Sequence, residues 1–124
     1  MKKKIMTVVS IAILLLMGVF TGSASAELRT GNISWYNGVG KVGYHGKVLD
    51  SNDCATELSV DNPPAGTSLD VLNYSNGESG ICQKWDGRQN FDHYSVILDV
   101  QKSFFENVLG EPSSVGWIDG RYSY

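Results

Sequence analysis

The sequence predicts a mainly β fold, a small barrel with one helix and one disulfide. Several short segments alternate apolar and polar residues, which is the pattern of half-buried strands. Helical spacing of apolar residues occurs in one segment, 101–109, and two cysteines stand 28 positions apart, at Cys54 and Cys82. We therefore expect strands, a hairpin, a strand, a helix and a last strand, in that order.

The first strand is predicted over 31–36, with the sequence GNISWY. Ile33 and Trp35 fall on one side of it, while Ser34 and Tyr36 share the other side. Trp35 is the large apolar residue of the first side, so we expect it to help fill the core.

The next segments carry little regular patterning. Residues 37–46 contain four glycines around Tyr44 and His45, a composition that favours an irregular loop. Residues 50–60 are weakly patterned, and no strand boundaries are predicted within 47–66.

A hairpin is predicted in the middle of the chain. Residues 67–74 alternate and run into Asn76-Gly77, the strongest short hairpin signal. The returning strand is expected over 78–85, delivering Asp86 at its end into a polar loop.

The C-terminal part is predicted to contain a buried strand, the helix and a closing strand. The β-branched and apolar run 94–98 ends at Asp99. The helix over 101–109 is followed by Gly110, where a glycine C-cap belongs. Residues 115–122 form the last strand, with Trp117 and Ile118 available to the core.

The N-terminus is typical of a secretory signal peptide over residues 1–26. Three lysines precede an apolar stretch that ends in Ala24-Ser25-Ala26, an A-x-A cleavage site. The stretch is shorter than the roughly 20 apolar residues of a membrane span, and no cysteine follows it to carry a lipid. We expect one secreted domain over 27–124, with no membrane anchor after cleavage.

Charge and composition restrict the partners. Without the three leader lysines, seven basic residues face 13 acidic ones, a net charge of about −6 that argues against nucleic acid. Neither His45 nor His93 has a partner at metal-ligand spacing, and no phosphate-binding glycine motif is present. We expect a monomer without metal or cofactor.

Cys54 and Cys82 are expected to form a disulfide, because export places them where disulfides persist. The bridge would close a loop of about 28 residues and contribute about 3 kcal/mol. A reactive thiol or a metal site is the alternative, but no CxxC spacing accompanies it.

Several motifs occur in a recognisable order. They are GNISWY at 31–36, Tyr44-His45-Gly46, Gly66-Thr67, Asn76-Gly77, Asp86, and Val96-Ile97-Leu98-Asp99 leading to Phe104 or Phe105. This ordered set resembles the double-psi β-barrel domains of the rare lipoprotein A and expansin type. The resemblance implies a six-stranded double-psi β-barrel.

The resemblance also implies a site. Asp99 and Asp86 would be the catalytic carboxylates and Ser34 their hydrogen-bonding neighbour, with Tyr36, Trp35 or Tyr44 available to stack on a sugar. Each residue has a structural alternative: Asp99 capping the helix, Asp86 in an ordinary loop, Ser34 as a strand residue, and Trp35 in the core.

Three departures from the family pattern favour weak or absent hydrolysis. Asp86-Gly87-Arg88-Gln89 replaces Asp-Arg-Gly-Pro, Asp99-Val100-Gln101 replaces Asp-Leu-Ser, and Cys54-Ala55-Thr56-Glu57 lacks the histidine of peptidoglycan-cleaving members.

Two functions follow. The first is a secreted, cell-wall-associated protein that binds or remodels polysaccharide, either peptidoglycan or a glucan; as an enzyme it would resemble a lytic transglycosylase acting on peptidoglycan. The alternative is a small secreted effector or inhibitor that uses the barrel as a scaffold for protein contacts, through the glycine-rich loop and the tyrosine-rich tail, Tyr122–Tyr124.

Overall fold

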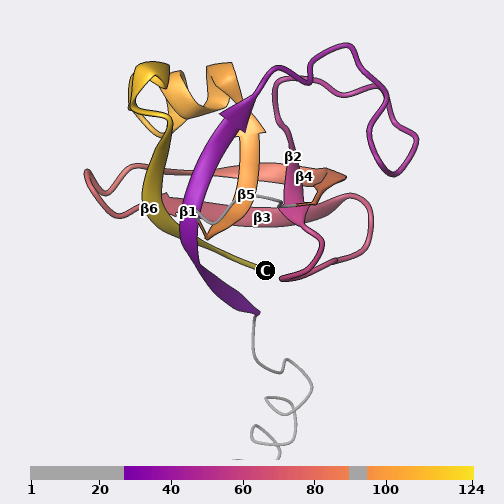
Figure 1. Ribbon diagram of the computed structural model, residues 1–124, viewed down its shortest axis with the longest axis horizontal. Coiled ribbons are helices and arrows are strands. Elements are labelled where there is room, and N and C mark those ends of the chain that lie inside the picture. Colours follow the sequence, from indigo (N-terminus) through magenta and orange to yellow (C-terminus); the bar gives the residue numbers. More distant parts are fainter. Residues whose placement is uncertain (1–26, 90–94) are drawn as a thin grey trace, which may run out of the picture.

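The computed structural model describes residues 27–89 and 95–124, so the predicted signal peptide 1–26 lies outside the described residues. Six strands close into a barrel in the order β1-β5-β2-β4-β3-β6 (Figure 1). The elements are β1 (Leu28–Tyr36), β2 (Asp53–Glu57), β3 (Thr67–Asn73), β4 (Ser79–Arg88), β5 (Val96–Gln101), η1 (Phe104–Val108), η2 (Ser113–Val115) and β6 (Trp117–Ser123). The predicted fold class is therefore confirmed.

The strands are interleaved in space. β1 pairs with β5 and β2 pairs with β4 in parallel, while the other four neighbouring pairs are antiparallel. Parallel strands cannot be joined by a tight turn, so the chain crosses the end of the barrel between them. The two parallel pairs give the double-psi arrangement that the resemblance implies.

Alternation along the strands fills the barrel. The side chains of Ile33, Leu69, Val71, Leu98 and Val100 are fully buried, as expected for the inward positions of half-buried strands. No helix in the described residues is long and apolar enough to cross a membrane.

The tyrosines of the C-terminal tail, which the alternative function used as a surface for protein contacts, are buried or half-buried. Tyr122 is fully buried in the core, and its hydroxyl donates to Asp61 at 3.3 Å. Tyr124 is half-buried, stacks on Tyr122, and donates to the same carboxylate at 2.7 Å. The alternation of β6 explains this, because it turns Tyr122 to the same side as Ile118.

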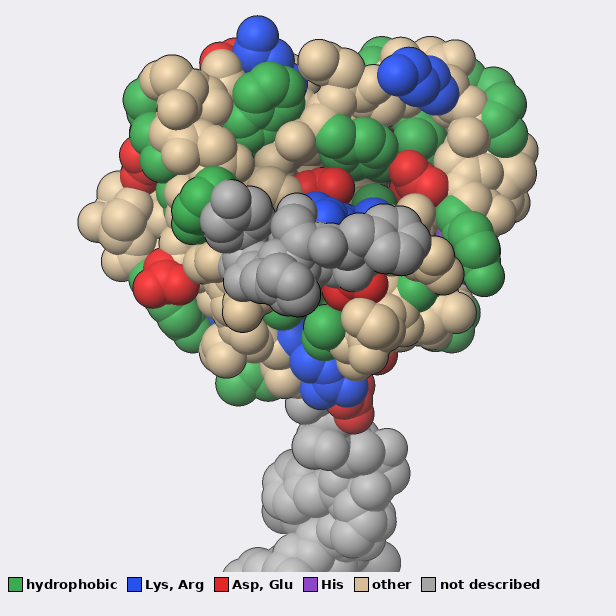
Figure 2. Space-filling view, in the orientation of Figure 1, with side chains coloured by type: hydrophobic (Ala, Val, Ile, Leu, Met, Phe, Trp, Pro, Cys, Tyr) green, Lys and Arg blue, Asp and Glu red, His purple; other side chains and the backbone are tan. Residues whose placement is uncertain are grey.

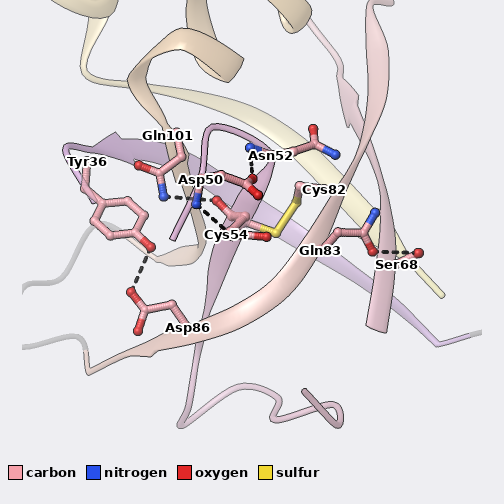
Figure 3. The surroundings of a disulfide bond; sticks show 10 residues. Tyr36, Asp50, Asn52, Cys54, Ser68, Cys82, Gln83, Asp86 and Gln101 are labelled. Atoms are coloured by element: carbon pink, nitrogen blue, oxygen red, sulfur yellow. Dashed lines mark hydrogen bonds between the residues drawn. A yellow bond between two sulfur atoms is a disulfide. The ribbon is translucent and has the colours of Figure 1, made fainter. Parts of the chain in front are cut away.

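β2 lies in the segment 47–66, where the sequence pattern did not allow strand boundaries to be placed. All five of its residues are buried, including the polar Asp53, Thr56 and Glu57. A strand covered on both faces shows no apolar-polar alternation, and this is why the pattern failed there. The predicted disulfide is confirmed, since Cys54 of β2 is bonded to Cys82 of the adjacent β4 (Figure 3).

The helical segment is shorter than predicted. The π-helix η1 spans Phe104–Val108, with Phe104, Phe105 and Leu109 buried as the spacing indicated. Gly110 follows with a φ of +71°, the left-handed conformation of a C-terminal glycine. Ser103 occupies the N-cap position, so the alternative that Asp99 caps the helix is wrong.

Candidate functional site

The strand register places several predicted site residues in one line across the barrel. Ser34 on β1 pairs with Asp99 on β5, Asp99 pairs with Ala55 on β2, and Ala55 pairs with Asp86 on β4. Directly opposed residues on neighbouring strands share a face, so this line of four, which we call the polar row, faces one way. Trp117 of β6 pairs with Ser34 and extends the row.

At one end of the polar row, Ser34 and Asp99 meet. The Ser34 hydroxyl donates to Asp99 Oδ1, and Arg88 Nη1 lies 3.1 Å from the same oxygen and 3.3 Å from Ser34 Oγ. Arg88 Nε is 3.3 Å from the buried Glu57 Oε1, so its guanidinium bridges two carboxylates. Sequence reasoning missed Arg88; its signal was the i,i+2 spacing from Asp86, which puts both on one face of β4.

These contacts bear on the chemistry of Asp99. A carboxylate that accepts from a hydroxyl and pairs with a guanidinium is arranged as an ionised acceptor. Glycoside hydrolysis needs a carboxylic acid that holds a proton and gives it to the leaving oxygen. The surroundings of Asp99 therefore favour a binding role over proton donation.

At the other end of the row, Asp86 joins three segments. Tyr36 donates its hydroxyl to Oδ2 at 2.8 Å (Figure 3). The backbone N–H groups of Tyr44 and Gly87 donate to Oδ1 at 2.7 and 2.9 Å. Burial, reinforced by the hydrogen bond to Asp86, raises the pKa of Tyr36, so its phenol stays protonated as a donor. Asp86 lies inside β4 rather than in the polar loop that was predicted.

Two aromatic residues lie elsewhere than predicted. Trp35 packs against the core, and its Nε1 donates to the Ser113 carbonyl at 2.8 Å, so it does not join Ser34 and Asp99. Trp117 was expected in the core but is 42% exposed, because β6 begins there and turns its first side chain outward. The exposed aromatic side chain at the Ser34 end of the polar row is therefore that of Trp117, while Tyr44 lies at the Asp86 end.

A second feature is the β1–β2 loop, residues 37–52, which projects from the barrel (Figure 1). Four of the ten large apolar side chains that are exposed among the described residues lie on it: Val39, Val42, Tyr44 and Val48. Hydrophobic side chains are visible in the corresponding upper right part of the space-filling view (Figure 2). They are 57 to 68% exposed, a concentration that the glycine-rich composition did not predict.

The β1–β2 loop is ordered by its own backbone. The N–H of Gly40 donates to the Leu49 carbonyl, and the N–H of Leu49 donates to the Lys41 carbonyl, both at 2.8 Å. The N–H of Gly43 donates to the Lys47 carbonyl at 2.8 Å. The side chain of Leu49, also on the loop, is buried. The exposed apolar side chains thus stand on a hydrogen-bonded framework.

The base of the loop is tied to the barrel. Gly38 N donates to Gln101 Oε1 at 2.9 Å, and Lys47 Nζ lies 2.5 Å from Oδ2 of the buried Asp53. Gly43 packs so closely on β4 that an added Cβ would lie 2.9 Å from the Trp85 carbonyl oxygen. The loop is therefore fixed relative to the polar row.

Among the described residues, no group of three or more His, Cys, Asp and Glu side chains is placed to hold a metal ion. What the described residues offer is an ordered apolar loop and a polar row with an exposed tryptophan at one end.

Comparisons with known proteins identify a relative and a shared fold. No family model matches the chain. The chain is 41% identical over 107 residues to the uncharacterized protein YdjM of Bacillus subtilis (strain 168), covering 85% of this chain and 83% of the relative. Among solved structures, Streptomyces papain inhibitor superimposes with a TM-score of 0.59 at 18% identity, over 78% of this chain and 92% of the inhibitor, which shows a common fold.

Proposed function

This chain belongs to the same family as the uncharacterized protein YdjM of Bacillus subtilis (strain 168), and we propose that it is an exported protein that binds another protein through the β1–β2 loop. The observation that carries the proposal is the gathering of four exposed apolar side chains on this ordered loop. Exposed apolar patches on small soluble proteins mark interaction sites.

The order of the loop supports binding. A loop that is already held in one conformation loses little conformational entropy when a partner covers it. The pairs Gly40–Leu49 and Gly43–Lys47 and the ion pair of Lys47 with Asp53 provide this order before any partner arrives. The exposed side chains can then contribute their burial to affinity.

The partner class that we propose is a papain-type cysteine peptidase, which the chain would inhibit. The structural neighbour of the same fold is a papain inhibitor by name. The barrel is closed, so it has no open sheet edge, and the Cys54–Cys82 disulfide joins two of its strands. Local unfolding is therefore costly, and the chain should resist cleavage by the peptidase that it binds. Such resistance is a requirement for an inhibitor.

The test is binding of the mature chain, residues 27–124, to papain by calorimetry, together with inhibition of peptide hydrolysis. Val42→Asp places a charge among the exposed apolar side chains of the loop, next to its bridge partner Val48, and is expected to weaken binding at least about tenfold. Val115→Asp is the matched control, because Val115 is a comparably exposed valine outside the loop. Equal binding by the Val42→Asp variant and the wild type, or no binding by the wild type, would refute the proposal.

A second candidate is binding of cell-wall polysaccharide along the polar row, as the resemblance to rare lipoprotein A and expansin domains implies. The observation that favours it is the exposed Trp117 beside Ser34 and Asp99, since an aromatic face next to hydrogen-bonding groups suits a sugar ring. The proposed activity is binding without hydrolysis.

This candidate predicts co-sedimentation of the protein with insoluble peptidoglycan or cellulose, and loss of it in Trp117→Ala. Val42→Asp serves as the control, because it leaves the polar row unchanged. Soluble fragments should not be released; release that disappears in Asp99→Asn would instead establish an enzyme. Co-sedimentation that survives Trp117→Ala would remove the polar row as the binding surface.

A further inference from the structure

A fully buried lysine lies under the β1–β2 loop. Lys84 of β4 has no exposed side-chain surface. Its Nζ lies 2.6 Å from His45 Nε2 and 2.5 Å from Asn62 Oδ1. Burying an ammonium is costly unless its protons are satisfied, and here an imidazole supplies one of the acceptors.

His45 belongs to the part of the loop that rests on β4. Its N–H donates to the Trp85 carbonyl at 3.4 Å, and its ring meets the Tyr44 ring edge-on at 4.9 Å. Lys84 Nζ also lies 5.8 Å from the centre of the Tyr44 ring. The lysine therefore supports the Tyr44–His45 corner of the loop from beneath.

The contact fixes the protonation state of His45. An ammonium can only donate, so while Lys84 carries its proton, Nε2 of His45 accepts and the proton of the neutral imidazole is on Nδ1. An imidazolium donates from both nitrogens. Protonation would thus turn the contact into two donors, each positively charged, facing each other 2.6 Å apart.

We propose that the Lys84–His45 contact is a pH-sensitive latch that holds the Tyr44 corner of the β1–β2 loop on β4 and releases it when His45 is protonated. The latch regulates the surface described under the proposed function and in that sense rests on it. The contact itself, however, belongs to the free protein and can be tested without a partner.

Two carboxylates near the latch, Asp86 and Asp61, also affect the charges of His45 and Lys84. Burial lowers the pKa of Lys84, and the charges of Asp61, in the segment between β2 and β3, and of Asp86 of β4 oppose this effect. Asp86 also attracts a proton to His45. Asp86 is already occupied by the N–H of Tyr44 and by Tyr36, so its charge offsets the repulsion from Lys84 only in part. The ammonium is the group in direct contact with the imidazole.

The direction of the pH effect follows from the same surroundings. Burial, and then the charge of Lys84, lower the pKa of His45 below its ordinary value. Near neutral pH the imidazole is mainly neutral whether it contacts Lys84 or not, and the latch is held. Below the ordinary pKa of histidine, His45 binds a proton more readily when it is released than when it contacts Lys84. Acid therefore favours release.

The test follows the His45 ring by NMR titration and the amide exchange of Tyr44 and His45 between about pH 7.5 and about pH 5.5. After correction for intrinsic rates, the wild type and His93→Gln are expected to lose protection on acidification, by a factor of at most about ten. His45→Gln retains an acceptor without titrating and should show no such loss. Lys84→Met removes the facing charge but leaves the burial, so the pKa of His45 should rise part of the way and the acid release should weaken.

Two results would overturn the latch: a His45 pKa in the wild type at or above its ordinary value, or the same acid loss of protection in His45→Gln. Both readouts use the free protein. A protein that fails to bind papain can therefore still show the latch, and a failed latch leaves loop binding at neutral pH untouched.

Discussion

Replacing both Cys54 and Cys82 with alanine is expected to lower the free energy of unfolding by about 3 kcal/mol. The bridge closes a loop of 28 residues, and without it the unfolded chain regains the conformational freedom of that loop. Alanine is the appropriate replacement, because a serine hydroxyl would be left in a buried apolar site. For a domain of this size the loss is a large part of the total stability.

The disulfide is expected to stabilise the attachment of β2 to β4 as well as the domain as a whole. β2 has five residues and pairs with β4 and β5, with long connections to β1 and to β3. Urea denaturation of the double variant and of the wild type, with and without reductant, measures the change. A loss below about 1 kcal/mol would mean that packing alone holds β2 against β4.

The part of the fold that could be predicted has a common physical origin. The β3–β4 hairpin was found because its strands are buried on one face and joined by Asn76-Gly77, signals that lie within a few residues of each other. β2 left no such signal, since neighbours cover both of its faces. The predicted end of β4 was a few residues too early, because the polar Asp86 indicated a loop. In the structure Asp86 lies within the strand, where its carboxylate accepts a hydrogen bond from Tyr36.

The candidate site depends on contacts between distant residues. Ser34 and Asp99 are 65 positions apart and meet through the parallel register of β1 and β5, which no local pattern encodes. Their meeting was anticipated only by the resemblance to a known barrel family. Arg88 and Lys84 were missed because charged residues on a strand are usually taken as solvent-exposed, whereas here both are held by partners inside the fold.

Asp86→Ala is expected to destabilise the protein by about 2 kcal/mol and to lower the pKa of Tyr36. The substitution leaves the half-buried Tyr36 hydroxyl without its acceptor and frees the N–H of Tyr44 from the barrel. Of the causes that raise the pKa of Tyr36, burial remains and the bond to Asp86 is lost, so the shift should be partial. Urea denaturation of the variant and the wild type measures the loss of stability, which decides the prediction.

The sign of the stability change distinguishes two roles for Asp86. A carboxylate retained for chemistry often stands in a strained or repulsive site, so that removing it stabilises the fold. A carboxylate that ties β1 and the β1–β2 loop to β4 is itself part of the fold, and removing it must destabilise. Asp70→Ala, at an exposed aspartate of β3, is the control for loss of a charge alone. A variant at Asp86 as stable as the one at Asp70 would show that the loop is held by the Lys47–Asp53 and Gly38–Gln101 contacts without Asp86.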